Sequence, residues 1–186
     1  MEENLTQEES LIKRIVICGP ESTGKTTMIN NLAVYFQTNY VDEFARDFLQ
    51  KKWDSKKEIC SKEDLIQIAK GQIKAENTNI KNSNKLIFCD TNILTTLAWS
   101  RTHFDEFCDP WLEKQSKLLA YDYYLILNTD IPWVKDDLRD RPKDRKKMFL
   151  AHKKELDNLN VDYDIINDSD FEKRFNQAVE YIKNKY

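Results

Sequence analysis

Eight residues near the amino terminus carry the clearest chemistry in this sequence. Residues 19–26 read Gly-Pro-Glu-Ser-Thr-Gly-Lys-Thr, the G-x-x-x-x-G-K-[ST] pattern of a phosphate-binding loop. In such a loop, glycine lets backbone N–H groups turn toward phosphate oxygens, while the lysine and the final hydroxyl serve the β- and γ-phosphates and Mg²⁺. The chain has only 3 glycines, and Gly19 and Gly24 fall at the two glycine positions. The sequence therefore predicts that a nucleoside triphosphate binds here.

We assign the nucleotide contacts to this loop and the residue after it. They are Gly19, Glu21, Ser22, Thr23, Gly24, Lys25, Thr26 and Thr27. Within this set we expect Lys25 to act on the transferring phosphoryl group and Thr26 to be a metal ligand.

A phosphoryl transferase also needs carboxylates near the metal and near the acceptor hydroxyl. Asp90 ends a strongly apolar run, which is the position of a Walker B aspartate that helps to hold Mg²⁺. The alternative is that Asp90 caps a helix beginning at Thr91, and the two roles are compatible. Glu43 is a candidate to accept the hydroxyl proton or to position the acceptor. Its alternatives are a solvent-facing acid on an amphipathic helix, or Asp42 as the base.

Further side chains at the predicted strand ends are candidates to contact the acceptor. The full predicted set is Asp42, Glu43, Arg46, Asp90, Asn92, Trp99 and Trp133. The two tryptophans offer faces on which an aromatic acceptor could stack, although tryptophans are commonly core or hinge residues. His103 and His152 lie in helical stretches, and we expect neither to be catalytic.

The segment at about 132–148 is rich in charge and in arginine. A guanidinium presents a planar fork to phosphate oxygens, and a charged, weakly apolar segment is typical of a lid that closes over ATP. We therefore predict a mobile lid in which Arg139, Arg141 and Arg145 neutralise charge during transfer. The alternative is a solvated helix face.

The elements that must position these residues follow from periodicity. Short apolar runs predict five strands, at residues 14–18, 39–41, 85–89, 123–127 and 163–166. Between them the apolar spacing becomes helical, as at 27–36, 65–73 and 171–182. Near-continuous apolar strands alternating with helices indicate an α/β fold with a parallel sheet flanked by helices, and ligands then bind at the carboxyl ends of the strands. With the phosphate loop, this predicts a P-loop NTPase fold.

Composition narrows the function classes. At 186 residues with 40% hydrophobic and 33% charged residues, the chain fits a single domain spanning 1–186. A net charge of -3 disfavours nucleic acid as a partner. No apolar run reaches the length of a membrane helix and the start is acidic, so we expect a cytoplasmic protein without a membrane partner and with free cysteines. The sequence lacks the D-x-x-G and N-K-x-D patterns of GTPases and the motifs of protein kinases.

Four motifs in order resemble the ribosylnicotinamide kinase domain of the NadR type. They are the phosphate loop, Glu43-Phe44-Ala45-Arg46, residues 90–96 (Asp-Thr-Asn-Ile-Leu-Thr-Thr) and residues 132–139 (Pro-Trp-Val-Lys-Asp-Asp-Leu-Arg). The phosphate loop alone is typical of the whole superfamily, whereas the later three point to this narrower family. At Asn92 the family pattern more often has a second aspartate.

The resemblance implies an ATP- and Mg²⁺-dependent phosphotransferase of NAD biosynthesis. Its reaction transfers the γ-phosphate of ATP to the 5′-hydroxyl of nicotinamide riboside, a small-molecule substrate, to give nicotinamide mononucleotide. The sequence lacks the H-x-G-H motif of the adenylyltransferase domain that often accompanies this kinase, so the resemblance covers the kinase module alone. Two alternatives stay open: a kinase of another nucleoside or nucleotide, and a non-catalytic switch that binds ATP. The oligomeric state is not predicted.

Overall fold

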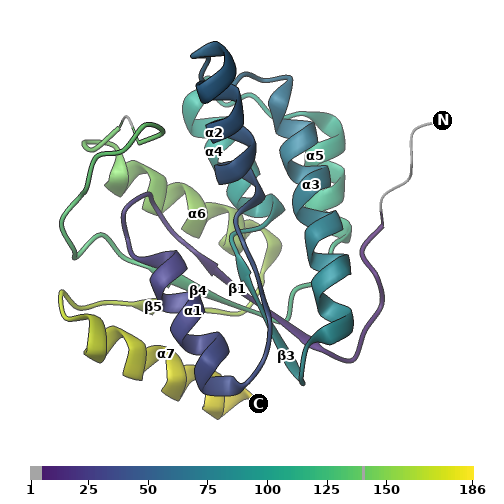
Figure 1. Ribbon diagram of the computed structural model, residues 1–186, viewed down its shortest axis with the longest axis vertical. Helices are drawn as coiled ribbons and strands as arrows, with labels where there is room; N and C mark the ends of the chain where they lie inside the picture. Colours follow the sequence, from purple (N-terminus) through teal and green to yellow (C-terminus); the bar gives the residue numbers. More distant parts are fainter. Residues whose placement is uncertain (1–5, 140) are drawn as a thin grey trace.

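The computed structural model describes residues 6–139 and 141–186, built around a five-stranded sheet. Figure 1 shows the helices arranged around this sheet. All strand pairs are parallel, in the order β2-β3-β1-β4-β5. The strands are β1 (Lys13–Cys18), β2 (Tyr40–Val41), β3 (Leu86–Asp90), β4 (Tyr123–Leu127) and β5 (Tyr163–Ile166). The predicted α/β architecture is confirmed, and every predicted strand is present with its ends shifted by no more than one residue.

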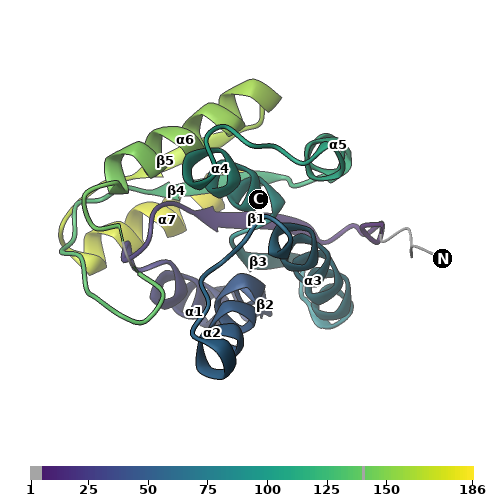
Figure 2. The same cartoon turned by 90° about the horizontal axis from the view of Figure 1, so that it is seen from above.

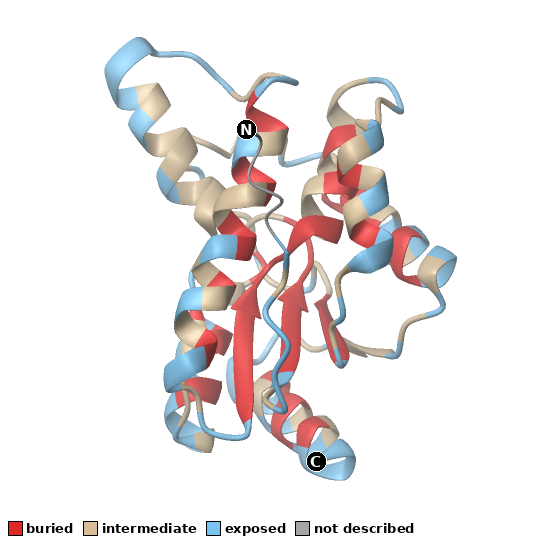
Figure 3. Ribbon diagram, turned by 90° about the vertical axis from the view of Figure 1, so that its right-hand side faces the viewer, coloured by how far each residue is buried: buried red, intermediate tan, exposed pale blue. Residues whose placement is uncertain are grey.

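Helices cover both faces of this sheet, which explains why the strands are almost continuously apolar. One face packs against α1 (Lys25–Phe36) and α7 (Phe171–Lys185). The other face packs against α3 (Asp64–Asn79), α4 (Ile93–His103), α5 (Pro110–Leu118) and α6 (Arg145–Leu159). Figure 2 shows α4 and α6 on one side of the sheet and α1 and α7 on the other. Strands β1, β3 and β4 form the buried centre (Figure 3).

Helix α2 (Phe44–Lys56) has a different environment, since none of its residues is fully buried. It follows β2 and packs against α3, where the ring of Phe44 lies over Gly71. A Cβ at Gly71 would be 2.2 Å from this ring, so the close approach of the two helices needs glycine there. A short 3₁₀ helix, Ile80–Asn82, leads from α3 toward β3. Among the described residues, no helix combines the length and apolarity needed to cross a membrane.

The central strand β1 places the phosphate loop beside the end of β3. In their parallel register Ile17 pairs with Asp90, so Asp90 is the last residue of β3 and not the first residue of a loop. The helix after the phosphate loop begins at Lys25, two residues earlier than predicted. As a result, Asp90 is held within β3 and Lys25 within α1, and neither residue lies in a loop.

The chain between β4 and α6, residues 128–144, is termed the connecting segment, and it is described except for residue 140. It contains no helix or strand among the described positions. The predicted lid at 132–148 overlaps it, but residues 145–148 form the first turn of α6. The mobility of this segment stays a prediction.

Candidate active site

The phosphate loop has the backbone conformation that its glycines permit. Gly19 has φ +135° and Gly24 has φ +80°, values that favour glycine. A Cβ at Gly19 would lie 2.6 Å from the carbonyl oxygen of Leu127, so the loop also needs glycine to pass the end of β4. Ser22 has φ 56° within the same loop. The loop therefore holds a tightly turned backbone directly before the N-terminus of α1, where N–H groups attract anions.

Lys25 is the first residue of α1, and its side chain reaches back to this loop. Its Nζ donates hydrogen bonds to the carbonyl oxygens of Gly19 and Pro20, each at 3.0 Å. The Oγ1 of Thr23 donates to the same Pro20 carbonyl at 2.9 Å. These bonds fix the ammonium group inside the loop, in position to contact the phosphates of a nucleotide.

Thr26, in the first turn of α1, and Asp90, at the end of β3, are in contact. The Oγ1 of Thr26 donates to Oδ2 of Asp90 at 2.8 Å, whereas Oδ1 is buried without a partner among the described residues. A hydroxyl and an unpaired carboxylate oxygen are hard oxygen donors that suit Mg²⁺. The described residues contain no group of three or more His, Cys, Asp or Glu that could hold a metal, so phosphate oxygens and water would supply the remaining ligands.

Burial raises the pKa of Asp90 to about 7, and the negative charge of Glu43 acts in the same direction. The positive charge of Lys25 and the hydrogen bond from Thr26 oppose this rise. Asp90 is only 2% exposed. A carboxyl group whose charge is this poorly compensated favours a cation at the same place.

The alternative role of Asp90 as a helix cap is wrong. Helix α4 begins at Ile93, and its cap is Asn92, whose Oδ1 accepts the N–H groups of Leu94 (3.1 Å) and Thr95 (3.4 Å). The amide nitrogen of Asn92 donates to the hydroxyl of Tyr124 at 3.0 Å. The side-chain oxygen of Asn92 thus caps α4 and its NH₂ group bonds Tyr124. Asparagine therefore has a structural role at this position, where the family pattern more often has an aspartate.

A cleft of about 510 Å³, counting the space open to solvent, lies at the carboxyl end of the sheet among α2, α3 and α4. Its lining consists of Glu43, Ala45, Leu49, Cys60, Leu65, Ile68, Gln72, Thr91, Asn92, Thr95, Thr96 and Trp99. Glu43 is the single charged residue in this lining, and burial raises the pKa of Cys60 to about 12, which keeps its thiol neutral. The cleft therefore carries one negative charge and no positive charge.

Backbone contacts fix both sides of the cleft. Thr91 is a β-branched residue with φ 64°, an uncommon conformation that tends to occur at functional sites. Its N–H donates to the carbonyl oxygen of Ile17 at 3.0 Å. Across the cleft, Oε1 of Gln72 accepts the N–H of Phe44 at 2.9 Å, which anchors the start of α2 and hence Glu43.

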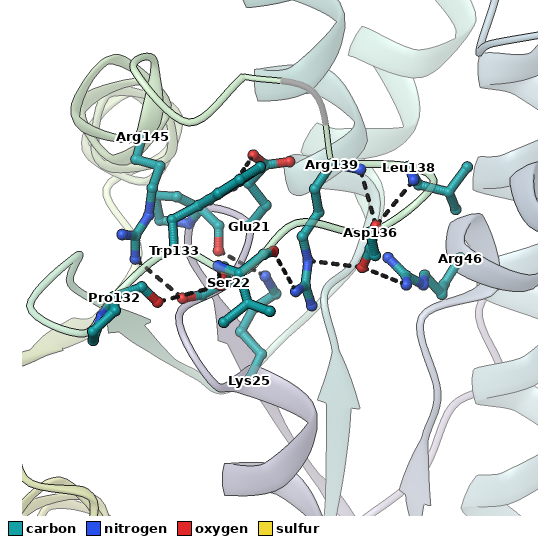
Figure 4. Close-up of polar contacts among 12 residues, drawn as sticks. Glu21, Ser22, Lys25, Arg46, Pro132, Trp133, Asp136, Leu138, Arg139 and Arg145 are labelled. Atoms are coloured by element: carbon teal, nitrogen blue, oxygen red, sulfur yellow. Dashed lines mark hydrogen bonds and ion pairs between the residues drawn. The ribbon is translucent and has the colours of Figure 1, made fainter.

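The connecting segment lies against the phosphate loop (Figure 4). The indole N–H of Trp133 donates to Glu21 at 2.6 Å, and the N–H of Val134 donates to Oγ of Ser22 at 2.8 Å. Arg145, at the start of α6, donates to the carbonyl oxygens of Ile131 (2.9 Å) and Ser22 (3.1 Å). The segment is thus joined to the loop at several points.

The predicted site residues divide between these places. Lys25, Thr26 and Asp90 come together, Glu43, Asn92 and Trp99 line the cleft, and Arg139 and Arg145 belong to the network beside the loop. Trp133 contacts Glu21 and does not line the cleft, and among the described residues the side chain of Arg141 forms one ion pair, with Asp144 at 3.9 Å. Asp42 is exposed, and its negative charge helps to raise the pKa of Asp90.

Thr27 is also exposed, on the first turn of α1. The histidines lie outside the lining of the cleft. His103 stacks on Trp99 with ring centroids 4.0 Å apart, and burial lowers the pKa of His152 to about 4.

Sequence reasoning missed Gln72 and Asp136. Gln72 shares the apolar face of α3, so its spacing marked it only as a core position. Asp136 sits in a run of charge in which no spacing rule distinguishes it from Asp137. Only the partners that each side chain meets in the fold separate these residues from their neighbours.

The comparisons with known proteins agree with this geometry. The AAA domain family matches residues 14–174. The chain belongs to this family. As an AAA domain, it is similar to the trifunctional NAD biosynthesis/regulator protein NadR of Escherichia coli, at 27% identity over 92% of the chain and 42% of the relative. The chain thus spans about two fifths of the length of that relative, and its resemblance to NadR is confirmed.

Solved structures share the fold of this AAA domain. NadR in complex with NR superposes with a TM-score of 0.78 at 19% identity, covering 94% of this chain and 50% of that chain. NadR in complex with NAD and AMP-PNP gives 0.75 at 18% identity, covering 94% and 49%. Thymidylate kinase from Ehrlichia chaffeensis gives 0.65 at 12% identity, covering 92% and 98%. The P-loop fold is therefore one that nucleotide kinases also have.

Proposed function

We propose that this protein is an ATP- and Mg²⁺-dependent kinase that phosphorylates the 5′-hydroxyl of nicotinamide riboside to give nicotinamide mononucleotide. The observation that carries the proposal is the position of the cleft. Thr91, which lines it, is the residue directly after Asp90, and Asp90 is bonded to Thr26. An acceptor in the cleft would then lie next to the phosphate loop. Phosphoryl transfer needs this proximity more than any covalent chemistry from the protein.

The donor side is assigned to the phosphate loop. The backbone N–H groups and Lys25 bind the phosphates of ATP, and Thr26 and Asp90 hold Mg²⁺. When bound, Mg²⁺ neutralises charge that develops on the phosphate oxygens. Arg145 donates to the backbone of the loop at Ser22, so it holds the loop in shape from the side of α6.

The acceptor side is assigned to the cleft. Glu43 accepts the proton of the 5′-hydroxyl or orients that hydroxyl, and its place at the start of α2 is fixed through Gln72. Trp99 offers an aromatic wall at the side of α4. Nicotinamide riboside carries a positive pyridinium ring, and a cation is attracted to the face of a tryptophan.

The charge of the cleft favours a nucleoside over a nucleotide as acceptor. A nucleoside monophosphate brings a dianion, and the lining contains one carboxylate and no cation to receive it. A cationic or neutral nucleoside meets no such repulsion. The unpaired state of all four cysteines is consistent with a reaction in the cytoplasm.

The test is a mass-spectrometric screen with ATP and Mg²⁺. The acceptors are nicotinamide riboside, the common nucleosides and their monophosphates, each assayed for the gain of one phosphate. The proposal predicts phosphorylated product from nicotinamide riboside and none from the monophosphates. If only another nucleoside gives a product, that nucleoside and not nicotinamide riboside is the acceptor. If no compound gives a product, the result favours a nucleotide-dependent switch.

A further inference from the structure

Asp136 joins two parts of the fold that lie 90 residues apart in the sequence. Its Oδ2 accepts a hydrogen bond from Arg46 at 2.6 Å and lies 3.0 Å from Nε of Arg139. Its Oδ1 accepts the backbone N–H groups of Leu138 (2.9 Å) and Arg139 (3.0 Å). Figure 4 shows Asp136 between the two guanidinium groups. Both carboxylate oxygens are therefore engaged, and the side chain is fixed in one orientation.

The two arginines keep unused donors. Among the described residues, Arg46 uses only one terminal nitrogen, in its bond to Asp136. Arg139 uses Nε for Asp136 and Nη1 for the carbonyl oxygen of Val134 at 2.9 Å, which leaves Nη2. A guanidinium has five N–H donors, so each group keeps N–H donors that Asp136 does not occupy.

Arg46 belongs to the acceptor side of the site. It lies in the first turn of α2, and its N–H donates to the carbonyl oxygen of Glu43 at 3.1 Å. Glu43 in turn lines the cleft. A shift of Arg46 would therefore be transmitted to the residue that we assign to the acceptor hydroxyl.

Arg139 belongs to the donor side. The connecting segment that carries it is bonded to the phosphate loop through Trp133 and Val134. A continuous series of hydrogen bonds and ion pairs thus runs from Glu21 and Ser22 in the loop, through the connecting segment, to the start of α2.

We propose that Asp136 is a positioning residue that holds Arg46 and Arg139 together and so couples nucleotide binding to acceptor binding. This inference rests on the proposed function for the identity of the acceptor. A nucleotide in the loop stabilises the connecting segment, Asp136 then fixes Arg46 and the start of α2, and the cleft binds its acceptor more tightly. By linkage, the acceptor tightens nucleotide binding by the same factor.

The neighbouring carboxylate supplies a matched control. Within the described part of the chain, Asp137 accepts one hydrogen bond, from Gln50 at 3.3 Å, and forms no ion pair with either arginine. Asp136→Asn keeps an oxygen for the backbone N–H groups but removes the charge that holds the arginines. Asp137→Asn makes the same chemical change one residue away.

The test measures the dissociation constant of nicotinamide riboside by calorimetry, with and without AMP-PNP. We expect AMP-PNP to tighten acceptor binding about fivefold in the wild type and in Asp137→Asn, and to have no effect in Asp136→Asn. A purely structural role for Asp136 would weaken binding under both conditions and leave the ratio unchanged. A ratio in Asp136→Asn equal to that of Asp137→Asn overturns the proposed coupling, as does a wild-type ratio of one.

Hydrogen exchange of residues 131–139 tests the same contacts without any ligand. Asp136→Asn should exchange several-fold faster than Asp137→Asn, because its segment has lost the anchor on α2. Equal exchange rates would show that Asp136 does not hold the segment. If the wild type does not bind nicotinamide riboside, the proposed function fails, and this comparison alone decides whether Asp136 holds the two arginines.

Discussion

The donor half of the site, residues 19–27 with Asp90, and the acceptor half, the cleft among α2, α3 and α4, are built in different ways. The donor half consists mainly of backbone and of side chains that are neighbours in sequence. The acceptor half takes its lining from three helices and three loops spread over residues 43–99. Phosphates are alike in every nucleotide, so one local pattern can serve them, whereas an acceptor is recognised by a surface that only the folded chain assembles.

The largest effect is expected from breaking the donor half at Lys25. Lys25→Ala removes the ammonium group that lies inside the loop, so kcat should fall about 10²–10³-fold while the fold is retained. Steady-state kinetics and circular dichroism measure the two quantities. Lys74→Ala, an exposed lysine on α3, is the control and should leave kcat unchanged. A Lys25→Ala variant with near wild-type turnover would falsify the assigned mechanism.

In the donor half, Asp90→Asn should lower activity but raise the stability of the fold at high pH. The carboxylate serves the metal, so kcat should fall about 10²-fold, and wild-type kcat/KM should rise with pH through about 7 as Asp90 ionises.

The pKa of Asp90 is higher in the folded protein than in the unfolded chain, so the protonated carboxyl group favours folding. This contribution to the free energy of unfolding is lost as pH rises from about 4 to about 7. Asp90→Asn should therefore raise Tm by about 2 °C or more at pH 8 and change it little at pH 4. Thermal unfolding at the two pH values measures this difference, and a lower Tm at pH 8 contradicts the assignment.

A substitution at Trp99 sharpens the contrast by acting on the acceptor half alone. Trp99→Leu removes an aromatic wall of the cleft, so the KM for nicotinamide riboside should rise about tenfold while the KM for ATP stays the same. Trp99→Phe retains a ring and should recover most of the loss. Equal KM values for nicotinamide riboside in the Leu and Phe variants would show that the ring does not bind the acceptor.

The smallest effect is expected within the connecting segment, where two arginines have different partners. Arg139 is bonded to Asp136 and Val134, whereas Arg141 has one long ion pair with Asp144. We expect Arg139→Ala to lower kcat/KM several-fold and Arg141→Ala to lower it less than about twofold. Kinetics of the two variants give this ranking, and a larger loss in Arg141→Ala would reverse it.

The same contrast explains how much could be predicted from the sequence. The strands and the phosphate loop depend on short-range patterns, so their positions were predicted to within a residue. Thr26 and Asp90, which the loop motif and the end of an apolar run marked as residues that share a metal, are in contact. Two helix starts were displaced by two residues. Helix α1 begins at Lys25, and α4 begins at Ile93 because Asn92 and not Asp90 caps it.

Long-range partners could not be predicted. Gln72 has the spacing of a core residue, and it takes part in the site only because α2 crosses α3 and presents the N–H of Phe44. Trp133 has the spacing of a strand-end aromatic, but the path of the connecting segment brings it to Glu21 and not to the cleft. No local pattern encodes which of two distant segments a side chain will meet.

The most direct test of the central claim is the stoichiometry of ADP and phosphorylated nicotinamide riboside. Wild-type protein is incubated with ATP and Mg²⁺, with and without nicotinamide riboside, and both products are quantified. The account predicts that ADP forms at a substantial rate only with the acceptor and in a one-to-one ratio with nicotinamide mononucleotide. ADP formation that is the same with and without nicotinamide riboside, with no phosphorylated riboside, would contradict it.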